Sequence, residues 1–495
     1  MKQTFGKLLL LLLAFSLVVT TFVGCNRTGE EDGTDTQADT QEPSETDDGY
    51  QSIDEWLPQQ NFGNGETPRQ VVMLTFPEYS TKYHLIEYEY DNVLSQVAVE
   101  RTLYINEYFN VDMVYEESRT IQQTLEQSVM TGGGNYDFVY PHAESAFPIM
   151  IVSGTFRDLR QYDAFNFDQP WWNQSSIETY TVNGKMFNAS CDTSISGQGF
   201  TSILVNRKIY DSLNTGEDIY EIVHDGKWTM EKMITLTRSY GTIIEGSDGT
   251  EDTYGLAFNE QYSTSFLYGM EQTIAAKNDA GEYSLAFDNE KVNNIAQKLY
   301  DLVWGSGDKI KSEYANYGQY PTSEIWKTFE GGRALMTTFA LGSLYYLLHE
   351  SDNIDFDIAY LPTPKFDEAQ KEYYVSTGAG FFCIPTSASD PEMSSVLLEA
   401  MAIYSYSEYR PLFFETILMG RLSDHEEDYE MLEFLHSRKT YDIGYTFDSE
   451  GIAVDMLINV VINKKSTNTA SYITARRTQF NKIFENIDAL RNATQ

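Results

Sequence analysis

The sequence is poor in the residues that mark most catalytic and metal sites. Its 495 residues include only 3 cysteines and 6 histidines. They form neither a CxxC pair nor an HExxH motif, and the GxSxG motif of α/β-hydrolases is missing. Carboxylate pairs indicate little about acid–base catalysis in a chain with 74 acidic residues. We therefore expect no catalytic residues, no metal and no cofactor.

Positive charge is scarce as well. The chain has 34 Lys and Arg against 74 Asp and Glu, which gives a formal net charge of −40. A surface of this kind repels polyanions and anionic lipid head groups. The composition therefore excludes nucleic acid as a partner.

Only two cysteines follow Cys25, and two states are open for them. An exported protein could join Cys191 and Cys383 in a disulfide. The alternative is a pair of buried free thiols, because a chain of this length builds a core that needs no cross-link.

Long apolar runs are limited to LLLLLLAFSLVV at residues 8–19. This run has the length of a signal-peptide core, whereas a membrane-spanning helix needs about 20 residues. Lys2 and Lys7 give the segment a positive start, and Gly24 stands directly before Cys25. The other interpretation of the run is an uncleaved apolar anchor.

The Gly24–Cys25 junction resembles the lipobox of bacterial lipoproteins, although Phe22 and Val23 depart from the usual pattern. The resemblance implies a signal peptide over residues 1–24 and a lipid on Cys25, with palmitate among its acyl chains. It also implies attachment to the extracellular face of the cell membrane, because several acyl chains anchor a protein stably.

The segment after Cys25 is acidic and almost free of apolar side chains. Residues 26–48 contain nine Asp or Glu and only one base, Arg27. Such a chain cannot bury enough apolar surface to offset its ordering entropy, and its charges keep it extended. We predict a disordered tether over residues 25–66.

The rest of the chain, roughly 430 residues, is long enough for two domains. Strand-like and helix-like patterns alternate at its start, which predicts an α/β fold with a largely parallel sheet. Strands are expected at residues 70–76, 111–117 and 135–141, and helices at 93–109, 119–134, 226–241 and 289–307. Thr229 and Asn289 are the expected N-caps of the last two helices.

Ligands in open α/β sheets bind beyond the carboxyl ends of the strands. Tyr140, His142 and Glu144 follow the third predicted strand and are therefore candidate ligand contacts.

Aromatic residues are abundant, with 35 Tyr, 28 Phe and 6 Trp, and two of them are adjacent in DQPWWNQ at residues 168–174. Neighbouring side chains point apart in regular structure. We expect one of Trp171 and Trp172 to lie in the core and the other to line a cleft, where an aromatic face suits a sugar ring. The alternative is that both fill the core.

Local patterns along nearly the whole remaining chain resemble those of the extracellular solute-binding lipoproteins of ABC importers, in the carbohydrate-binding group that includes maltose-binding proteins. The resemblance rests on the order of YDFVYPHAESAFPIMIVSGTFRDLRQY, YTVNGKMFNAS, FTSILVNRKIYDSL, DGKWTMEKM, WKTFEGGRALMTTFALGSL and YYVSTGAGFFCIPTSASDPE. Met230, Val205 and the segment 339–341 depart from the group's pattern near its cleft.

The resemblance implies a two-lobe, periplasmic-binding-protein-like fold of type II, with a sheet flanked by helices in each lobe and a ligand cleft at the hinge. Lobe one would comprise residues 68–205 and 340–380, and lobe two 206–339 and 381–495. The chain would cross between them near Leu204–Arg207, Thr338–Leu341 and Thr377–Cys383.

The implied function is capture of a sugar or oligosaccharide by a monomer that delivers it to the transmembrane subunits of an ABC permease. The fold also admits a receptor for a peptide or another solute. A secreted carbohydrate-active enzyme is a third hypothesis, because glycosidase carboxylates have no local signature. The expected ligand contacts, from the strand-end rule and the resemblance, are Tyr140, His142, Glu144, Trp171, Trp172, Asp192, Tyr262, Phe266 and Phe339.

Overall fold

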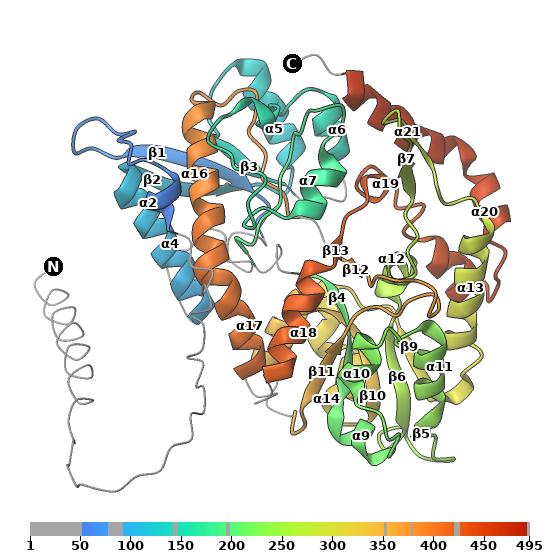
Figure 1. Cartoon of the computed structure of the whole chain (residues 1–495). Helices are drawn as coiled ribbons and strands as arrows, with labels where there is room; N and C mark the ends of the chain where they lie inside the picture. The colour runs from blue at the N-terminus through green and yellow to red at the C-terminus, as the bar shows by residue number, and fades with distance from the viewer. Residues whose placement is uncertain are drawn as a thin grey trace, which may run out of the picture. The chain divides into compact units, whose positions relative to one another are not determined.

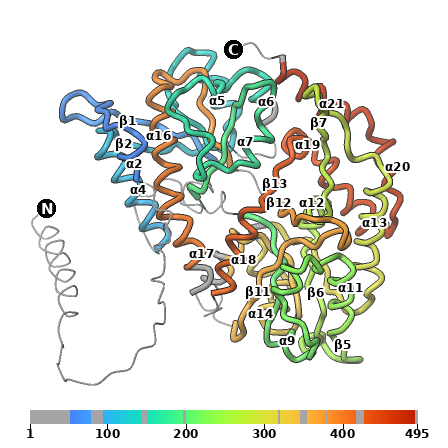
Figure 2. The backbone as a smooth tube through the Cα atoms, viewed as in Figure 1, coloured from blue at the N-terminus to red at the C-terminus, as the bar shows by residue number. Residues whose placement is uncertain are grey.

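The computed structural model describes residues 52–77, 93–141, 147–194, 199–350, 354–377, 380–419 and 426–492. Cys25 and the predicted signal peptide lie outside the described residues. Residues 49–495 form one compact unit, and two separate β-sheets organise it (Figures 1 and 2).

The first sheet has three parallel strands, with β1 (Arg69–Thr75) between β2 (Val111–Glu117) and β3 (Phe138–Tyr140). The connecting helices are α4 (Val93–Phe109) and α5 (Ile121–Thr131). The predicted order of strands and helices and the parallel pairing are confirmed. Val71, Met73 and Leu74 of β1 are fully buried and Val72 is partly buried, as expected for a parallel strand covered on both faces.

The second sheet is larger and mixed. Its order is β11-β4-β10-β6-β5, with β9 beside β6. β4 runs antiparallel to both of its neighbours, and β6 runs parallel to β10 and β9. The strands are β4 (Thr201–Asn206), β5 (Gly241–Thr242), β6 (Thr253–Asn259), β9 (Ile310–Glu313), β10 (Ala334–Ala340) and β11 (Ile358–Leu361).

Two helices beside this sheet begin where the sequence predicts. The Thr229 hydroxyl accepts the Lys232 N–H at the start of α11 (Met230–Ser239). The Asn289 side chain accepts the Val292 N–H at the start of α13 (Glu290–Val303). Both caps satisfy backbone donors that the first helical turn leaves unpaired.

Shorter elements complete the two lobes. They are α6 (Phe147–Val152), α7 (Gln174–Tyr180), α9 (Arg207–Ser212), α10 (Ile219–His224), α12 (Ser265–Gly269), α14 (Glu324–Glu330), α15 (Leu341–Glu350), and the strand pairs β7 (Ala275–Lys277) with β8 (Tyr283–Leu285) and β12 (Val375–Ser376) with β13 (Lys439–Thr440).

The predicted division of the chain between the lobes is wrong in three places. Strands β4 and β11 lie in the second sheet, so residues 201–205 and 340–376 belong with the second lobe. Residues 382–385 form bridges with the first lobe, one of them between Cys383 and Val139 of β3, and α16 (Pro391–Tyr404) packs on α4. A buried apolar strand has the same sequence pattern in either sheet, so the pattern could not assign it.

The C-terminal part is helical and returns to the second lobe. There α18 (Glu426–Ser437) packs on β11, α20 (Thr469–Ala475) on α13, and α21 (Arg477–Asn492) on β8 and also on α6. Two further helices are α17 (Arg410–Met419) and α19 (Ile443–Thr446). The sequence pattern predicts two helices between Ile452 and Leu490. The structure has two there, α20 and α21, but they begin only at Thr469, and most of residues 452–463 form turns and a π-helical segment.

The predicted tether extends too far, because residues 52–66 pack on the folded body. Ile53 of α2 (Ile53–Trp56) and Leu57 are buried. The Trp56 ring meets the Trp171 ring edge-on, with centroids 4.9 Å apart. The hydroxyl of Tyr108 donates to the Leu57 carbonyl at 3.0 Å. A few apolar side chains at the end of a polar segment are enough to hold it.

Both described cysteines, Cys191 and Cys383, are free and buried, so the free-thiol alternative holds. Burial raises the pKa of the Cys191 thiol to about 12, with the adjacent Asp192 adding to the shift. Within the described part of the chain, every helix is too short or too polar to cross a bilayer.

Candidate ligand-binding site

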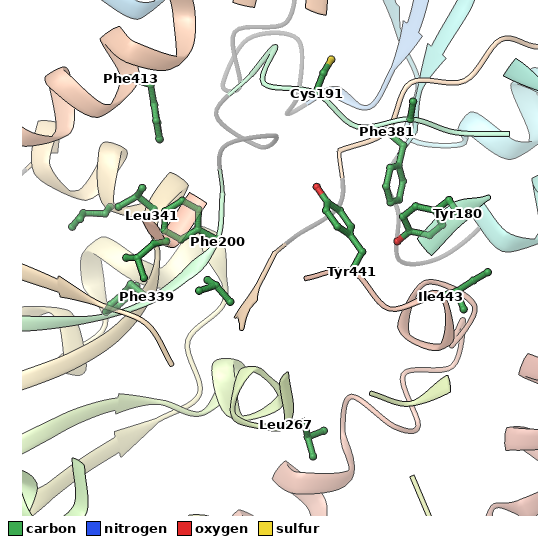
Figure 3. Packing of buried hydrophobic residues seen from close by; sticks show 14 of the residues in the cluster. Tyr180, Cys191, Phe200, Leu267, Phe339, Leu341, Phe381, Phe413, Tyr441 and Ile443 are labelled. Carbon is green, nitrogen blue, oxygen red and sulfur yellow. The ribbon is translucent and has the colours of Figure 1, made fainter. Parts of the chain in front are cut away.

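Three chain segments meet where the lobes are joined. The backbone N–H of Leu341 donates to the Phe200 carbonyl at 2.8 Å, and Phe200 pairs with Thr377 as an antiparallel bridge. The Thr377 hydroxyl donates to the carbonyl of Gly199 at 2.5 Å. Figure 3 shows Phe200, Phe339 and Leu341 grouped together.

The segments at Phe200 and Thr377 connect the lobes, whereas the segment at Leu341 does not. The chain enters the second lobe at residues 199–201, and it has left that lobe between Thr377, which pairs with Phe200, and Phe382, which pairs with Ala189 of the first lobe. The predicted crossing at Thr338–Leu341 joins β10 to α15, which both belong to the second lobe. The predicted crossing at Leu204–Arg207 lies at the opposite end of β4 from the observed one. Farther along the chain, α17 contacts both α4 of the first lobe and α15 of the second.

A cavity of about 560 Å³ lies beside these segments. Its walls come from the connecting segments, from the turn after β6, and from the C-terminal segment around residue 450. The lining residues are Phe200, Thr201, Gln261, Tyr262, Thr264, Ser265, Tyr314, Ala340, Ser376, Thr377, Tyr445, Asp448, Ser449, Gly451, Val454, Asp455 and Ile458.

The wall after β6 is held by a chain of hydrogen bonds. Asn259 ends β6 and accepts the backbone N–H of Gln261 at 3.2 Å. Tyr262 and Tyr320 join their hydroxyls at 2.8 Å, and the Tyr320 hydroxyl donates to Gln261 Oε1 at 3.0 Å. The Tyr262 ring also packs on Phe339, with centroids 6.2 Å apart. These contacts fix the orientation of the Tyr262 ring at the cavity.

The C-terminal wall is organised by Asp448. Its carboxylate accepts the backbone N–H of Ile452 at 3.0 Å and of Ala453 at 2.7 Å. Gly451, at φ +64°, closes the preceding turn by donating to the Asp448 carbonyl at 2.9 Å. Burial raises the pKa of Asp448 to about 6, against the lowering effect of the backbone donors.

The two walls are tied directly to each other. The Thr264 hydroxyl donates to the Val454 carbonyl at 2.7 Å. Next to Val454, the carboxylate of Asp455 is exposed and lines the cavity, and partial burial raises its pKa. The cavity thus combines aromatic rings with hydroxyl, amide and carboxylate groups, which are the groups that hold a polyhydroxylated ligand.

The three ligand contacts predicted from the second lobe, Tyr262, Phe266 and Phe339, differ in whether they line the cavity. Tyr262 lines the cavity. Phe339 is fully buried behind Tyr262. Phe266 follows Ser265, which lines the cavity, but its own ring is buried against Phe258.

Of the residues predicted at the end of β3, Tyr140 is described and does not line the cavity. Tyr140 is buried, with its hydroxyl 3.2 Å from the Ser194 hydroxyl and its ring 4.8 Å from that of Phe382. His142 and Glu144 lie outside the described residues.

Trp171 and Trp172 are both in the core of the first lobe, each 1% exposed. Their indole N–H groups donate to the two oxygens of one carboxylate, Glu399 of α16, at 2.8 and 2.7 Å. Residues 167–171 form turns, so the alternation of side chains that holds in a strand does not apply. The alternative in which both tryptophans fill the core is the one observed, and neither lines the described cavity.

Asp192 belongs to a buried charged cluster rather than to the described cavity lining. Its Oδ1 lies 3.0 Å from His436 Nε2 and 3.2 Å from Lys439 Nζ, and Arg410 is 4.0 Å from Oδ2. Burial opposes ionisation of Asp192, but the charges of its partners lower its pKa overall. Burial also lowers the pKa of His436, to about 4.

Sequence reasoning missed most of the cavity. Gln261, Tyr314, Tyr445, Asp448 and Asp455 are the clearest cases. Gln261 stands beside a predicted residue, Tyr262, and could have been found from it. The two aspartates carry no local signal among 74 acidic residues.

No protein-family model matches the chain, and no curated protein matches its sequence. Its structure is similar to solved structures of binding proteins. One is the ABC substrate-binding protein Lmo0181 from Listeria monocytogenes in complex with cycloalternan, at 9% identity and TM-score 0.50, over 86% of this chain and 98% of that one.

A second is the maltose/maltodextrin-binding domain MalE from Bdellovibrio bacteriovorus bound to maltotriose, at 15% identity and TM-score 0.52, over 84% of this chain and 99% of that one. A third is the galacto-N-biose-/lacto-N-biose I-binding protein of the ABC transporter from Bifidobacterium longum with lacto-N-biose, at 13% identity and TM-score 0.53, over 85% and 98%. The predicted α/β, two-lobe, periplasmic-binding-protein-like fold is confirmed.

Proposed function

We propose that this chain is the extracellular substrate-binding component of an ABC transporter, which captures a sugar or oligosaccharide between its lobes and delivers it to a membrane permease. One observation carries the proposal. The cavity at the lobe connections is lined by tyrosines, hydroxyls, an amide and carboxylates, in a fold whose three neighbours named above are sugar-binding proteins.

The chemistry of the cavity supports binding rather than catalysis. One of its two carboxylates, Asp448, is engaged by backbone N–H groups of its own loop. The connection at residues 199–201 is a short segment, and hinge closure about a few such residues is how two-lobe proteins enclose a ligand.

A calorimetric screen of neutral and acidic oligosaccharides on the purified protein tests the function. A ligand at a hundredfold over its Kd raises the free energy of unfolding by about 2.7 kcal/mol, so a thermal melt detects binding independently. Recovery of the unchanged sugar supports transport. Cleavage of the sugar would show a carbohydrate-active enzyme, and binding of peptides but not sugars would show another kind of receptor.

The membrane anchor is a separate part of the proposal, supported by the apolar run and the Gly24–Cys25 junction. Lipidated Cys25 would hold the protein at the cell surface next to its permease. The substitution Cys25→Ser is expected to leave the protein unprocessed or to release it from the membrane fraction. Unchanged mass and unchanged membrane partition would rule out acylation.

A further inference from the structure

The charged groups that line the cavity have one sign. Of the seventeen lining residues, the only two with ionisable charge at neutral pH are Asp448 and Asp455, and no lysine, arginine or histidine is among them. The other polar lining groups are hydroxyls, one amide and backbone.

From this lining we propose that the ligand carries no negative charge, and that a neutral or amine-bearing carbohydrate binds where an acidic one is rejected. The inference rests on the proposed function and names the substrate class of the same cavity. It separates neutral and amino sugars from uronic acids, sulfated sugars and sugar phosphates.

The two carboxylates act on a ligand in different ways. Asp448 is 5% exposed and its oxygens already accept two backbone N–H groups, so it contributes mainly charge at the wall. Asp455 is exposed, and the backbone bonds of this residue are made by its N–H and carbonyl, to Gly451 and Asn459. Its carboxylate is therefore placed to accept a hydroxyl or ammonium proton of a ligand.

A carboxylate, sulfate or phosphate group on the ligand would be disfavoured in this cavity. Such a group needs donors or a base, because an unpaired anion that leaves water for a partly closed cavity loses its hydration without compensation. Arginine and lysine are the side chains that usually supply this pairing, and the described lining has neither.

Two further features favour the same class of ligand. The formal net charge of −40 repels anions before they reach the cavity and attracts cations. Tyr262, Tyr314 and Tyr445 line the cavity, and an aromatic face attracts an ammonium group as well as the C–H face of a sugar ring.

The test uses three disaccharides with the same β-1,4-linked glucose-type skeleton: cellobiose, its diamino analogue from chitosan, and its terminal uronic acid. The same trio is prepared on whichever skeleton the oligosaccharide screen identifies. Calorimetry at low and high salt measures each Kd. We expect the neutral and amino forms to bind at least about tenfold more tightly than the acid, with a smaller ratio at high salt.

Three variants, two at Asp455 and one control, connect the result to the cavity. Asp455→Lys is expected to weaken binding of the amino form and to reduce the discrimination against the acid. Glu245→Gln removes one charge from an exposed position outside the lining and is expected to leave all three values unchanged. Asp455→Asn is a second variant in case the charge reversal disturbs folding.

The outcomes separate the two proposals. Equal or tighter binding of the acidic sugar overturns the charge inference and leaves the proposed function standing. Failure of every carbohydrate to bind overturns the proposed function and this inference with it. If neither Asp455→Lys nor Asp455→Asn changes the ratio of the Kd values for the neutral and acidic sugars, the result contradicts the role of this cavity.

Discussion

Lys439 places its ammonium group 3.2 Å from the Asp192 carboxylate, with both side chains at most 5% exposed. The two residues come from different parts of the chain. Asp192 belongs to the segment just before the chain enters the second lobe, and Lys439 follows α18, which packs on that lobe. The pair is therefore a buried link across the region where the lobes are joined.

Removing Lys439 is expected to destabilise the fold strongly. The substitution Lys439→Met leaves Asp192 buried without its ammonium partner, with Arg410 4.0 Å away. Breaking one partner of a buried pair costs about 3 to 5 kcal/mol, and denaturant unfolding at pH 7 measures the loss. The matched change Lys482→Met, at an exposed ion pair with Glu485, should cost less than about 1 kcal/mol. Similar losses in both variants would contradict the link.

The tryptophan pair is expected to affect stability and not ligand affinity. Trp171→Ala and Trp172→Ala each remove a buried ring and one of the donors to Glu399. A cost of about 3 to 5 kcal/mol is expected for each in denaturant unfolding. Glu399→Gln provides the control, because it keeps the volume but replaces one acceptor oxygen with a donor. A loss of sugar affinity in a folded tryptophan variant would contradict the core assignment.

The first lobe could be predicted from sequence because its strands and helices alternate with clear periods. The strand β1, the helix α4 and the strand β2 follow one another with the expected boundaries. The caps Thr229 and Asn289 were also readable, since a side-chain oxygen before an amphipathic run satisfies donors locally.

The sheet that each strand joins and the residues that line the cavity were harder to predict from sequence, because both depend on contacts between distant segments. β4 carries a uniformly buried pattern that suits either sheet. Glu399 pairs with indoles more than 220 residues away in sequence, and nothing near it in sequence marks it as a partner. Asp448 and Asp455 reach the cavity through the turn at Gly451, which a prediction of two tail helices did not include.

Two N-terminal truncations should behave differently. Removal of residues up to 50 leaves α2 intact, and we expect a melting temperature close to that of the parent. Removal up to residue 60 also deletes Ile53, Trp56 and Leu57, which pack on the first lobe. Burial of apolar side chains contributes about 1.5 to 3 kcal/mol each, so a loss of several degrees is expected in a thermal melt. Identical melting temperatures would show that this segment adds no stability.

Asp448 should make stability depend on pH in a defined direction. Its pKa is raised from 3.8 to about 6 by burial, with Asp455 adding to the shift. The folded state therefore holds this proton more tightly than the unfolded state. The stabilisation is complete below pH 4 and is lost as the pH rises through 6.

The variant Asp448→Asn removes this titration. The free energy of unfolding of the parent, relative to the variant, should fall by roughly 2 to 3 kcal/mol between pH 4 and pH 7. Denaturant unfolding at several pH values measures the difference. Asp488→Asn, at a side chain 54% exposed on α21, is the matched control for the loss of one carboxylate. A parallel pH dependence in parent and Asp448→Asn would show that Asp448 is ionised in the folded state throughout this range.

Tyr262 offers the sharpest separation of ligand binding from stability. Tyr262→Ala removes an aromatic face from the cavity and should weaken sugar binding by about 2 to 4 kcal/mol, the range of large anchor residues. Tyr262→Phe keeps the ring and removes the hydroxyl, which bonds Tyr320 and also interacts with Ser343 and the Ala340 backbone, so a smaller loss of about 1 kcal/mol is expected. Calorimetry gives the affinities, and a thermal melt measures the stability that is lost with the packing on Phe339. Tyr283→Ala, on β8 outside the described lining, should bind like the parent. If Tyr262→Ala also keeps parental affinity while folded, the sugar is held elsewhere than in this cavity.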